Sequence, residues 1–459
     1  MEHMSNIKKF VVEHKRLIFI FVFCLLVYEF SAYSINFSDP EAMYAFSHAI
    51  KMGEVPYRDF NIISTPLYAF IMTPGLFIFD NYLTFIIEQS ILVTILFWFL
   101  FKVFDKKAWF VLFAMVATLF MGMTLTYNFM CFFWIVILWY LEKECSDKDL
   151  LIGVVIGLAI LSKHTVGLPL ILPMFIICFK DIKKLGKRIL GICIPCFIFL
   201  IYLLINHALY DFINLSFLGL FDFRASNAIL NYDFIRCAII IGIIMIITIL
   251  KNHKDKYNYY LLCGLLFAYP IFDMNHFGVL FNCFAILIIN YIKVKRINYF
   301  SKLSIIVTII YSIFFFVDFI FNYPTVFYKG INHYQYTLGF KSDYIQNKKA
   351  NKLIDNYVEK ANKDNKKYIL LSGYSMFYNL TQDNKITYYD VLFYGNLGYN
   401  GTERMIKEID SMKNTYVIVD MNSYIYKDDT QINKKIYKHV VNNYEMIDEK
   451  DVLRLYYKP

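Results

Sequence analysis

The chain has 459 residues, of which 58% are hydrophobic and 46 are Phe, and its mean hydropathy is +0.46. Soluble globular proteins have roughly 45–50% apolar residues, so this composition excludes an ordinary soluble domain and indicates a helical protein that crosses a membrane several times. The net charge of +9 does not indicate a nucleic-acid partner, because the Lys and Arg residues lie in short connections between apolar segments, where they set membrane orientation.

Apolar segments recur along the first two thirds of the chain. Eleven membrane spans are predicted, at residues 17–37, 82–101, 108–125, 128–141, 150–161, 166–179, 189–205, 234–250, 257–270, 277–292 and 303–321. No small-residue cleavage site follows the first of them, so it is interpreted as an uncleaved helix rather than a signal peptide. Several segments are shorter than the usual 17–25 residues. We expect 108–141 and 150–179 each to form a tight helical hairpin.

The distribution of Lys and Arg predicts the orientation of these spans. With the N-terminus inside, the inner connections carry 21 Lys and Arg residues, and the outer connections carry five, Lys51, Arg58, Lys163, Arg224 and Arg236. Merging one hairpin into a single helix would move most of the later cations outside, against the positive-inside rule. The N-terminus is therefore expected in the cytoplasm and the C-terminus outside.

The composition changes near residue 322. Residues 1–321 are expected to form an α-helical polytopic transmembrane domain with a first outer loop at 38–81, and residues 322–459 a small extracytoplasmic α/β domain. Strands are predicted at 366–373, 415–422 and 452–458, and helices at 401–414 and 430–444, an alternation typical of α/β domains. The glycines at 395, 398 and 401 do not have the spacing of a dinucleotide-binding loop. This domain is interpreted as a lid, an acceptor-binding module or a structural support.

The first outer loop contains features of a surface helix followed by an interfacial segment. Asp39 is a suitable helix N-cap and Pro40 suits the first helical position, so a helix with one apolar face is predicted to end at Gly53. The later segment 65–79 is apolar but contains two Pro residues. We expect it to lie in the membrane interface rather than to cross the bilayer.

The unusual polar residues of the chain fall in connections on the same predicted side. They are Asp39, Glu41 and Asp59 in the first outer loop, Lys163, His164 and Thr165 in the outer turn of a hairpin, and Asp273 and His276 in another outer turn. This agreement between separate connections predicts a polar site at the outer surface of the membrane.

The stretch "SDPEAMYAFSHAIKMGEVPYRDFN…TPLY" resembles the first extracytoplasmic loop of GT-C fold membrane glycosyltransferases, in particular bacterial relatives of protein mannosyltransferases and aminoarabinose transferases. The resemblance consists of an acidic start to a surface helix, the later Pro-Tyr-Arg-Asp, and a Pro-led apolar segment. The outer "LSKHTVG", the outer Asp-x-x-His and the α/β tail also fit. Pro40 separates two acids that are often adjacent in relatives, so either Asp39 or Glu41 could be the working carboxylate.

This resemblance implies transfer of a sugar from a polyprenyl-phosphate donor to an acceptor hydroxyl, with inversion, at the outer face of the bacterial cell membrane. The acceptor would be a cell-envelope glycan, a lipid or a protein. A carboxylate, Asp39 or else Glu41, would act as general base. Asp59 would orient the site or, with Asp39, bind a divalent cation such as Mg, Mn or Zn. The residues expected to contact donor or acceptor are Lys163 on the lipid phosphate with Arg58 or His276 in support, and Tyr57, His164, Arg224 and Asp273.

Other interpretations of the same residues stay open. The structural ones are a helix cap at Asp39, an exposed ion pair of Asp59 with Arg58 or Lys51, a snorkelling Lys163, and a capping pair of Asp273 and His276. Other functions are a flippase or transporter of lipid-linked sugars and a polymerase of surface polysaccharide. A transporter should have inverted repeats and ionisable residues near the midplane, and we find no internal repeat in the sequence.

Overall fold

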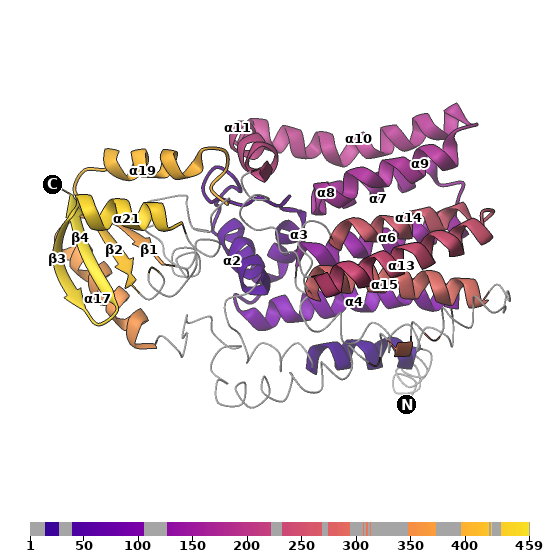
Figure 1. Cartoon of the computed structure of the whole chain (residues 1–459), viewed down its shortest axis with the longest axis horizontal. Coiled ribbons are helices and arrows are strands. Elements are labelled where there is room, and N and C mark those ends of the chain that lie inside the picture. Colours follow the sequence, from indigo (N-terminus) through magenta and orange to yellow (C-terminus); the bar gives the residue numbers. More distant parts are fainter. Residues whose placement is uncertain are drawn as a thin grey trace, which may run out of the picture. The chain divides into compact units, whose positions relative to one another are not determined.

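The structure, a computed structural model, is mostly helical and contains one small sheet (Figure 1). It describes residues 14–26, 39–104, 126–221, 232–268, 274–293, 306, 309–310, 313, 348–372, 396–421, 424 and 433–458. The chain divides into two units. Unit 1 contains Met1–Asn36, Asn81–Ile198 and Ile229–Leu338, and unit 2 contains Phe37–Asp80, Phe199–Ala228 and Gly339–Pro459.

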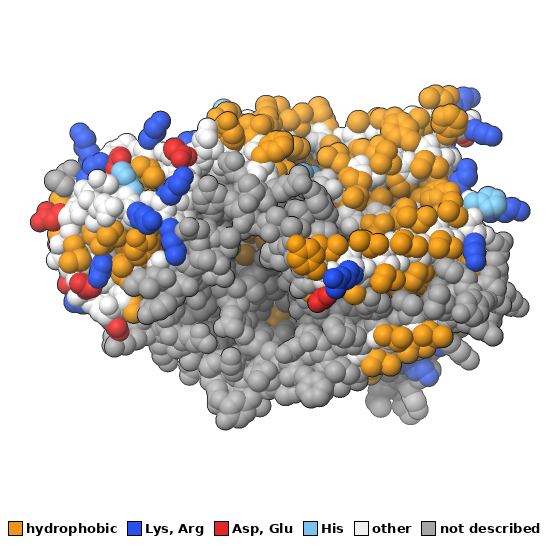
Figure 2. Space-filling view, viewed as in Figure 1, with side chains coloured by type: hydrophobic (Ala, Val, Ile, Leu, Met, Phe, Trp, Pro, Cys, Tyr) orange, Lys and Arg blue, Asp and Glu red, His pale blue; other side chains and the backbone are white. Residues whose placement is uncertain are grey.

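Unit 1 is a bundle of apolar helices. They are residues 14–26, α4 (Tyr82–Phe104), α6 (Tyr127–Glu144), α7 (Asp149–Ser162), α8 (His164–Gly167), η3 (Leu168–Leu170), α9 (Ile171–Cys178), most of α10 (Ile182–Ile205), α13 (Tyr232–Lys251), η5 (Lys256–Asn258), α14 (Tyr259–Leu262), η6 (Cys263–Ala268) and α15 (Met274–Lys293). In Figure 2, hydrophobic side chains form most of the described surface of unit 1 on the side that faces the viewer.

Three helices of the described part are long and apolar enough to cross a membrane, Leu83–Phe104, Ile182–Ile205 and Tyr232–Lys251. They coincide with the spans predicted at 82–101, 189–205 and 234–250. The other predicted spans correspond to helices that are shorter or less apolar, or fall wholly or largely outside the described residues, as 108–125 and most of 303–321 do. The structure therefore supports a helical membrane protein at this coarser level.

The hairpin predicted at 150–179 is present, with its turn at Lys163. Lys163 has an extended backbone between α7 and α8. A side chain at Gly167 would come within 2.4 Å of the Ile160 backbone, so the chain reverses direction and α8 packs against the end of α7. Only a residue without a side chain fits such a close approach of two helices.

The α7 and α10 helices also approach each other closely. A Cβ at Gly153 would lie 2.1 Å from the Arg188 carbonyl oxygen, and one at Gly157 would lie 2.5 Å from the Pro195 ring. Gly153 and Gly157 are four residues apart, so they lie on the same face of α7. This is the small-residue spacing that lets helices approach in membranes.

The helix ends that were predicted to face the cytoplasm meet at one end of unit 1. Lys143, near the end of α6, donates a hydrogen bond to the Asn290 side-chain oxygen near the end of α15 (2.6 Å). The Arg16 guanidinium of the first helix lies over the Phe101 ring near the end of α4 (5.8 Å). Segments predicted to alternate in direction across the bilayer thus have their basic ends together.

Unit 2 combines the first outer loop with an α/β domain. Its helices next to the first loop are α2 (Asp39–Lys51), α3 (Leu67–Leu76), the end of α10, α11 (Leu209–Ile213) and η4 (Asn214–Leu218), a turn of π-helix. The α/β part contains α17 (Lys348–Lys363), β1 (Lys367–Leu371), α19 (Gly401–Ser411), β2 (Thr415–Asp420), α21 (Lys434–Asn443), β3 (Glu445–Lys450) and β4 (Leu453–Lys458).

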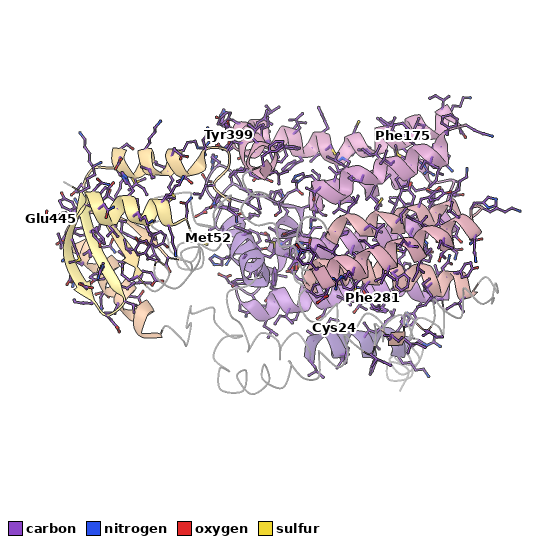
Figure 3. All side chains as sticks on the ribbon, in the orientation of Figure 1. Cys24, Met52, Phe175, Phe281, Tyr399 and Glu445 are labelled. Atoms are coloured by element: carbon purple, nitrogen blue, oxygen red, sulfur yellow. The ribbon has the colours of Figure 1, made fainter. Side chains whose placement is uncertain are left out.

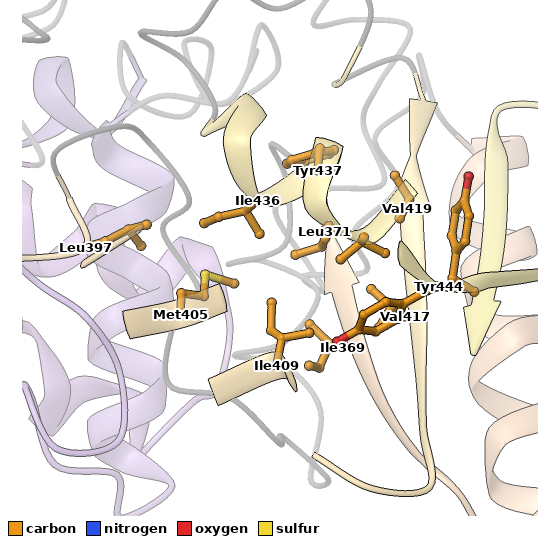
Figure 4. Close-up of a cluster of buried hydrophobic side chains, with 12 residues drawn as sticks. Ile369, Leu371, Leu397, Met405, Ile409, Val417, Val419, Ile436, Tyr437 and Tyr444 are labelled. Atoms are coloured by element: carbon orange, nitrogen blue, oxygen red, sulfur yellow. The ribbon is translucent and has the colours of Figure 1, made fainter. Parts of the chain in front are cut away.

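The four strands form one sheet in the order β1-β2-β4-β3. β1 and β2 are parallel, because α19 connects them, and the remaining pairs are antiparallel. On one face of the sheet, Leu371 and Val419 pack against Ile409 of α19 and Tyr437 of α21 (Figure 4). α17 covers the opposite face. The domain therefore has a helix layer on each side of the sheet.

The three predicted strands and the two predicted helices of this region are found, but α17 and β3 were missed. β3 is "EMIDEK", an edge strand without a continuous apolar face, so no alternation marks it in the sequence. Its pairing with β4 also shifts register between Met446 and Asp448. α17 does have an apolar stripe, which packs under the sheet, so its signal was present and was not used.

Candidate functional site

A helix is present at the start of the first outer loop, as predicted, but it is not a surface helix with one apolar face, because the consecutive residues Met43–Ser47 are all buried. α2 begins at Asp39 and ends at Lys51, and Gly53 adopts a left-handed φ of 90°. The Glu54 N–H donates to the Ala49 carbonyl and the Gly53 N–H to the Ile50 carbonyl, both at 3.0 Å. This pair of bonds is the Schellman motif, in which glycine satisfies the last helix carbonyls.

The acids Asp39 and Glu41 lie in the first turn of α2, but their side chains fall outside the described part of the structure. The first turn of a helix favours a carboxylate, because the free backbone N–H groups carry partial positive charge. Their backbone position is compatible with a cap as well as with catalysis. The assignment of Asp39 or Glu41 as general base stays a prediction.

The α3 helix has the short, Pro-broken form expected for the segment 65–79. α3 contains Pro74 and is followed by Phe77, Ile78 and Phe79, each at least 66% exposed. Its Thr73 hydroxyl lies 3.3 Å from the Ser47 carbonyl of α2. A ten-residue helix is about 15 Å long, which is too short to cross a hydrocarbon core of about 30 Å.

Asp59 is paired with its neighbour Arg58. The Arg58 Nε and Nη2 atoms donate to the two Asp59 carboxylate oxygens at 2.8 and 2.7 Å, and the Val55 N–H donates to Oδ2 at 2.7 Å. Hydrogen bonding to Asp59 raises the pKa of Arg58. The Asp59 carboxylate therefore shapes the turn at residues 55–59, and an ion pair of this kind was one of the structural interpretations left open by the sequence.

Tyr57 is buried inside unit 2. Its backbone is left-handed (φ 72°), its hydroxyl donates to the Ser64 carbonyl at 2.8 Å, and its ring packs edge-on against Phe212. Burial raises the pKa of the Tyr57 hydroxyl, and Ser216 lies near it. These contacts give Tyr57 a clear part in shaping the loop, and its contact with substrate stays a prediction.

The C-terminal domain is bonded to the same region of unit 2. The buried Asn61 side chain donates to the Asn396 carbonyl (3.1 Å), and the Tyr399 N–H donates to the Asn214 side-chain oxygen (3.2 Å). Tyr399 is labelled in Figure 3, where it lies beside α11. Sequence reasoning missed these bonds, because nothing local indicates that residues so far apart are partners.

Lys163 lies in unit 1 in a polar and aromatic environment. Its Nζ donates to the Asn128 side-chain oxygen at 2.6 Å and lies over the rings of Tyr127 and Phe267, 5.4 and 5.1 Å from their centroids. These contacts place the Lys163 ammonium group beside an amide oxygen and two aromatic faces. An ammonium held in this way can bind an anionic group such as a phosphate.

The remaining predicted residues are placed less completely. His164 and His276 are buried in unit 1, whereas Arg224 and Asp273 lie outside the described residues. Among the residues that the structure describes, no three His, Cys, Asp or Glu residues are grouped so that they could hold a metal ion. The Asp39 side chain lies outside the described part of the structure, so the divalent-cation site with Asp39 and Asp59 stays a prediction.

The predicted residues are divided between the two units. Unit 1 contains Lys163, His164 and His276, and unit 2 contains the first outer loop with its three acids. The convergence of the loop acids with Lys163 in one pocket stays a prediction.

A buried charge cluster of unit 1 was also missed. Arg188 is fully buried and binds Glu142 and Asp149, although in the sequence it counted only as one of the inner-loop cations. The sequence contained one sign of this cluster, the glycines of α7, because they indicate close packing of α7 against a neighbouring helix.

Comparison with known proteins gives no match to a protein family, to a curated protein or to a solved structure.

Proposed function

We propose that this protein is a membrane glycosyltransferase that transfers a sugar from a polyprenyl-phosphate donor to an acceptor hydroxyl at the outer membrane surface. The observation that carries the proposal is the folded first loop. Its helix α2 carries Asp39 and Glu41 in the first turn, ends at Lys51, and is followed by the Arg58–Asp59 turn and the short helix α3. The sequence of this loop is the part of the chain that resembles the glycosyltransferase family.

The chemistry assigns different roles to these groups. Asp39 or Glu41 accepts the proton of the attacking hydroxyl. The leaving group is a phosphate, which needs a cation rather than a strong acid. Lys163, held by Asn128 and two aromatic rings, supplies that cation in the proposal. Because Asp59 is paired with Arg58, its proposed role is to orient the loop.

The proposed topology has eleven spans, the N-terminus in the cytoplasm and the α/β domain outside. The meeting of Lys143 and Arg16 with other helix ends at one end of unit 1 supports it. Fusions to the C-terminus test the sidedness. Alkaline phosphatase, which folds only outside the cytoplasm, should be active there, and green fluorescent protein exported in unfolded form should stay dark. The opposite pair of results would refute the proposed topology.

Sugar transfer from defined polyprenyl-phosphate sugars in isolated membranes tests the activity. Because general base catalysis typically contributes 10²–10⁴-fold, Asp39→Asn or Glu41→Gln should lower the rate by about that factor. Glu54→Gln, which removes a carboxylate of the same loop, is the matched control and should keep the parent rate. Lys163→Gln should lower kcat, because the ammonium group stabilises the phosphate as it leaves, and should also raise the KM for the donor.

Two results would overturn this proposal. Full activity of both Asp39→Asn and Glu41→Gln would remove the base assignment. Movement of a solute or lipid-linked sugar across the membrane without consumption of the donor would favour the transporter alternative.

A further inference from the structure

Residues Leu209–Phe221, which include α11 and η4, carry a row of exposed apolar side chains. The apolar residues Tyr210, Ile213, Phe217, Leu218 and Phe221 are exposed, between 39% and 77%. The polar residues Asn214 and Ser216 are buried, as is Leu215 between them. Tyr210, Ile213, Phe217 and Phe221 recur at spacings of three and four, so they form one stripe. A stripe of this size is unusual on a surface that faces water.

The direction of the segment separates it from the spanning helix before it. α10 ends at Ile205, and His207 has a left-handed φ of 55° in the turn that follows. The Phe212 ring then packs against Phe199, two turns back in α10, with 5.5 Å between centroids. The chain therefore bends at residues 206–208 instead of continuing along α10. Figure 1 shows α11 turned out of the direction of α10.

The length of the segment excludes a second crossing. Leu209–Phe221 has 13 residues, which is about 20 Å of helix, whereas a hydrocarbon core is about 30 Å thick. The segment follows a helix that is long and apolar enough to span, so it begins where that helix leaves the hydrocarbon. Apolar exposed and polar buried side chains at that level fit the boundary between headgroups and acyl chains.

We propose that Leu209–Phe221 lies in the plane of the bilayer, with its Tyr210–Phe221 stripe in contact with phospholipid at the headgroup boundary. The partner is thus the lipid surface itself. This inference does not depend on the proposed glycosyltransferase activity.

The buried residues of the segment connect it to the first outer loop and to the α/β domain. Asn214 accepts the Tyr399 N–H, Ser216 lies near the buried Tyr57 hydroxyl, and the Tyr57 ring packs on Phe212. An interfacial α11–η4 segment therefore holds both the first outer loop and the start of the α19 region at the level of the lipid headgroups.

Photo-crosslinking tests the proposal on the full-length protein in phospholipid bilayers. p-Benzoylphenylalanine is placed singly at Tyr210 or Phe221, which are 71% and 77% exposed and should tolerate the change. Both positions should give phospholipid adducts, attached at the glycerol or the upper half of the acyl chain. Phe197 on α10 serves as a spanning control with deeper adducts. Met446, an exposed apolar residue of β3, should give no lipid adduct.

The proposal is overturned if Tyr210 and Phe221 behave like Met446 while Phe197 still forms adducts. It is also overturned if the crosslinks at these two positions join two copies of the chain, or if the adducts lie only in the lower half of the acyl chains.

Discussion

Replacing Arg188 tests whether a buried ion cluster holds α6, α7 and α10 together. Its guanidinium binds Glu142 through Nη1 (2.7 Å) and Nη2 (3.0 Å) and Asp149 through Nε (2.9 Å). The side chains of Glu142 and Asp149 are only 5% and 11% exposed. Arg188→Met would keep most of the side-chain volume but remove the ion partner of Glu142 and leave Asp149 with Lys184, 3.8 Å away.

The expected loss of stability comes from the buried carboxylates that remain after Arg188 is replaced. Removing one partner from a buried ion pair typically costs about 3–5 kcal/mol, because the remaining charge is buried without compensation. Two charge-assisted hydrogen bonds and a third close ion contact are lost here, while Lys184 stays 3.8 Å from Asp149, so we expect a decrease within that range. Replacing Glu142 and Asp149 by Leu in the same chain removes the stranded charges and should restore stability to within about 1–2 kcal/mol of the parent.

Unfolding in detergent, followed by fluorescence and far-UV circular dichroism, measures these differences. Arg236→Met is the matched control, because Arg236 pairs with Asp233 while both side chains are at least 76% exposed. Exposed pairs contribute about 0–1 kcal/mol, so this variant should unfold like the parent. The reasoning is wrong if Arg188→Met is as stable as Arg236→Met, or if the triple variant is no more stable than Arg188→Met.

Three further outcomes follow from the described contacts. Gly153→Ala should lower stability, because its Cβ would lie 2.1 Å from the Arg188 carbonyl oxygen. Gly186→Ala is the control and should not lower stability, because no atom lies within 4 Å of the added Cβ. Thermal unfolding of the two variants measures this difference. Burial raises the pKa of Asp410, but hydrogen bonds from His439 and its other donors outweigh it and hold that pKa below its usual value. The resulting stability is present at neutral pH and is lost as the pH falls below 4, so Asp410→Asn should destabilise by up to about 1 kcal/mol at pH 7 and flatten the decline of unfolding midpoint between pH 5 and 3. Asn214→Ala should expose the Tyr399 region to limited proteolysis without changing the helical content, and unchanged cleavage would contradict the bond that it makes.

Local signals in the sequence predicted several elements because each depends on residues close in the chain. Gly53 provides the left-handed residue that ends α2, and its two hydrogen bonds are formed within six residues. The turn at Lys163 was predicted from charge, because only a reversal there keeps the later cations on one side. β1 and β2 are alternating or continuous apolar runs that are buried on both faces, so their composition was enough to identify them.

The positive-inside count treated Arg188 as one more loop cation, because a count of charges contains no information on burial. The structure places it inside the bundle, between two carboxylates from other helices. Gly153 and Gly157 were a readable sign of close helix packing, but they do not identify the partner helix. Predicting that Arg188 is buried required knowing that α7 packs against α10.

The partners of the candidate site residues could not be predicted for a related reason. Asn128 as the hydrogen-bond partner of Lys163, and Asn214 as the partner of the Tyr399 N–H, come from distant parts of the chain. A neutral Asn side chain also has no charge that would favour one partner over another from sequence alone. The apolar stripe at Tyr210–Phe221 could have been found from the sequence, because apolar residues at spacings of three and four are visible without coordinates.

The pairing of Asp59 narrows the chemistry that the first loop can perform. A carboxylate that accepts two bonds from Arg58 and one from the Val55 N–H is stabilised as an anion by fixed donors, so protonating it would break bonds that hold the turn. The first turn of α2 differs, because its free N–H groups and helix dipole stabilise charge without a dedicated cation. In the proposed reaction the acceptor hydroxyl becomes acidic only as its bond to the sugar forms, so its proton leaves late. If proton transfer accompanies late bond formation, the rate of the parent protein should show a solvent isotope effect. The variant that removes the base, Asp39→Asn or Glu41→Gln, should abolish this isotope effect. Arg58→Lys should lower the rate without changing the isotope effect.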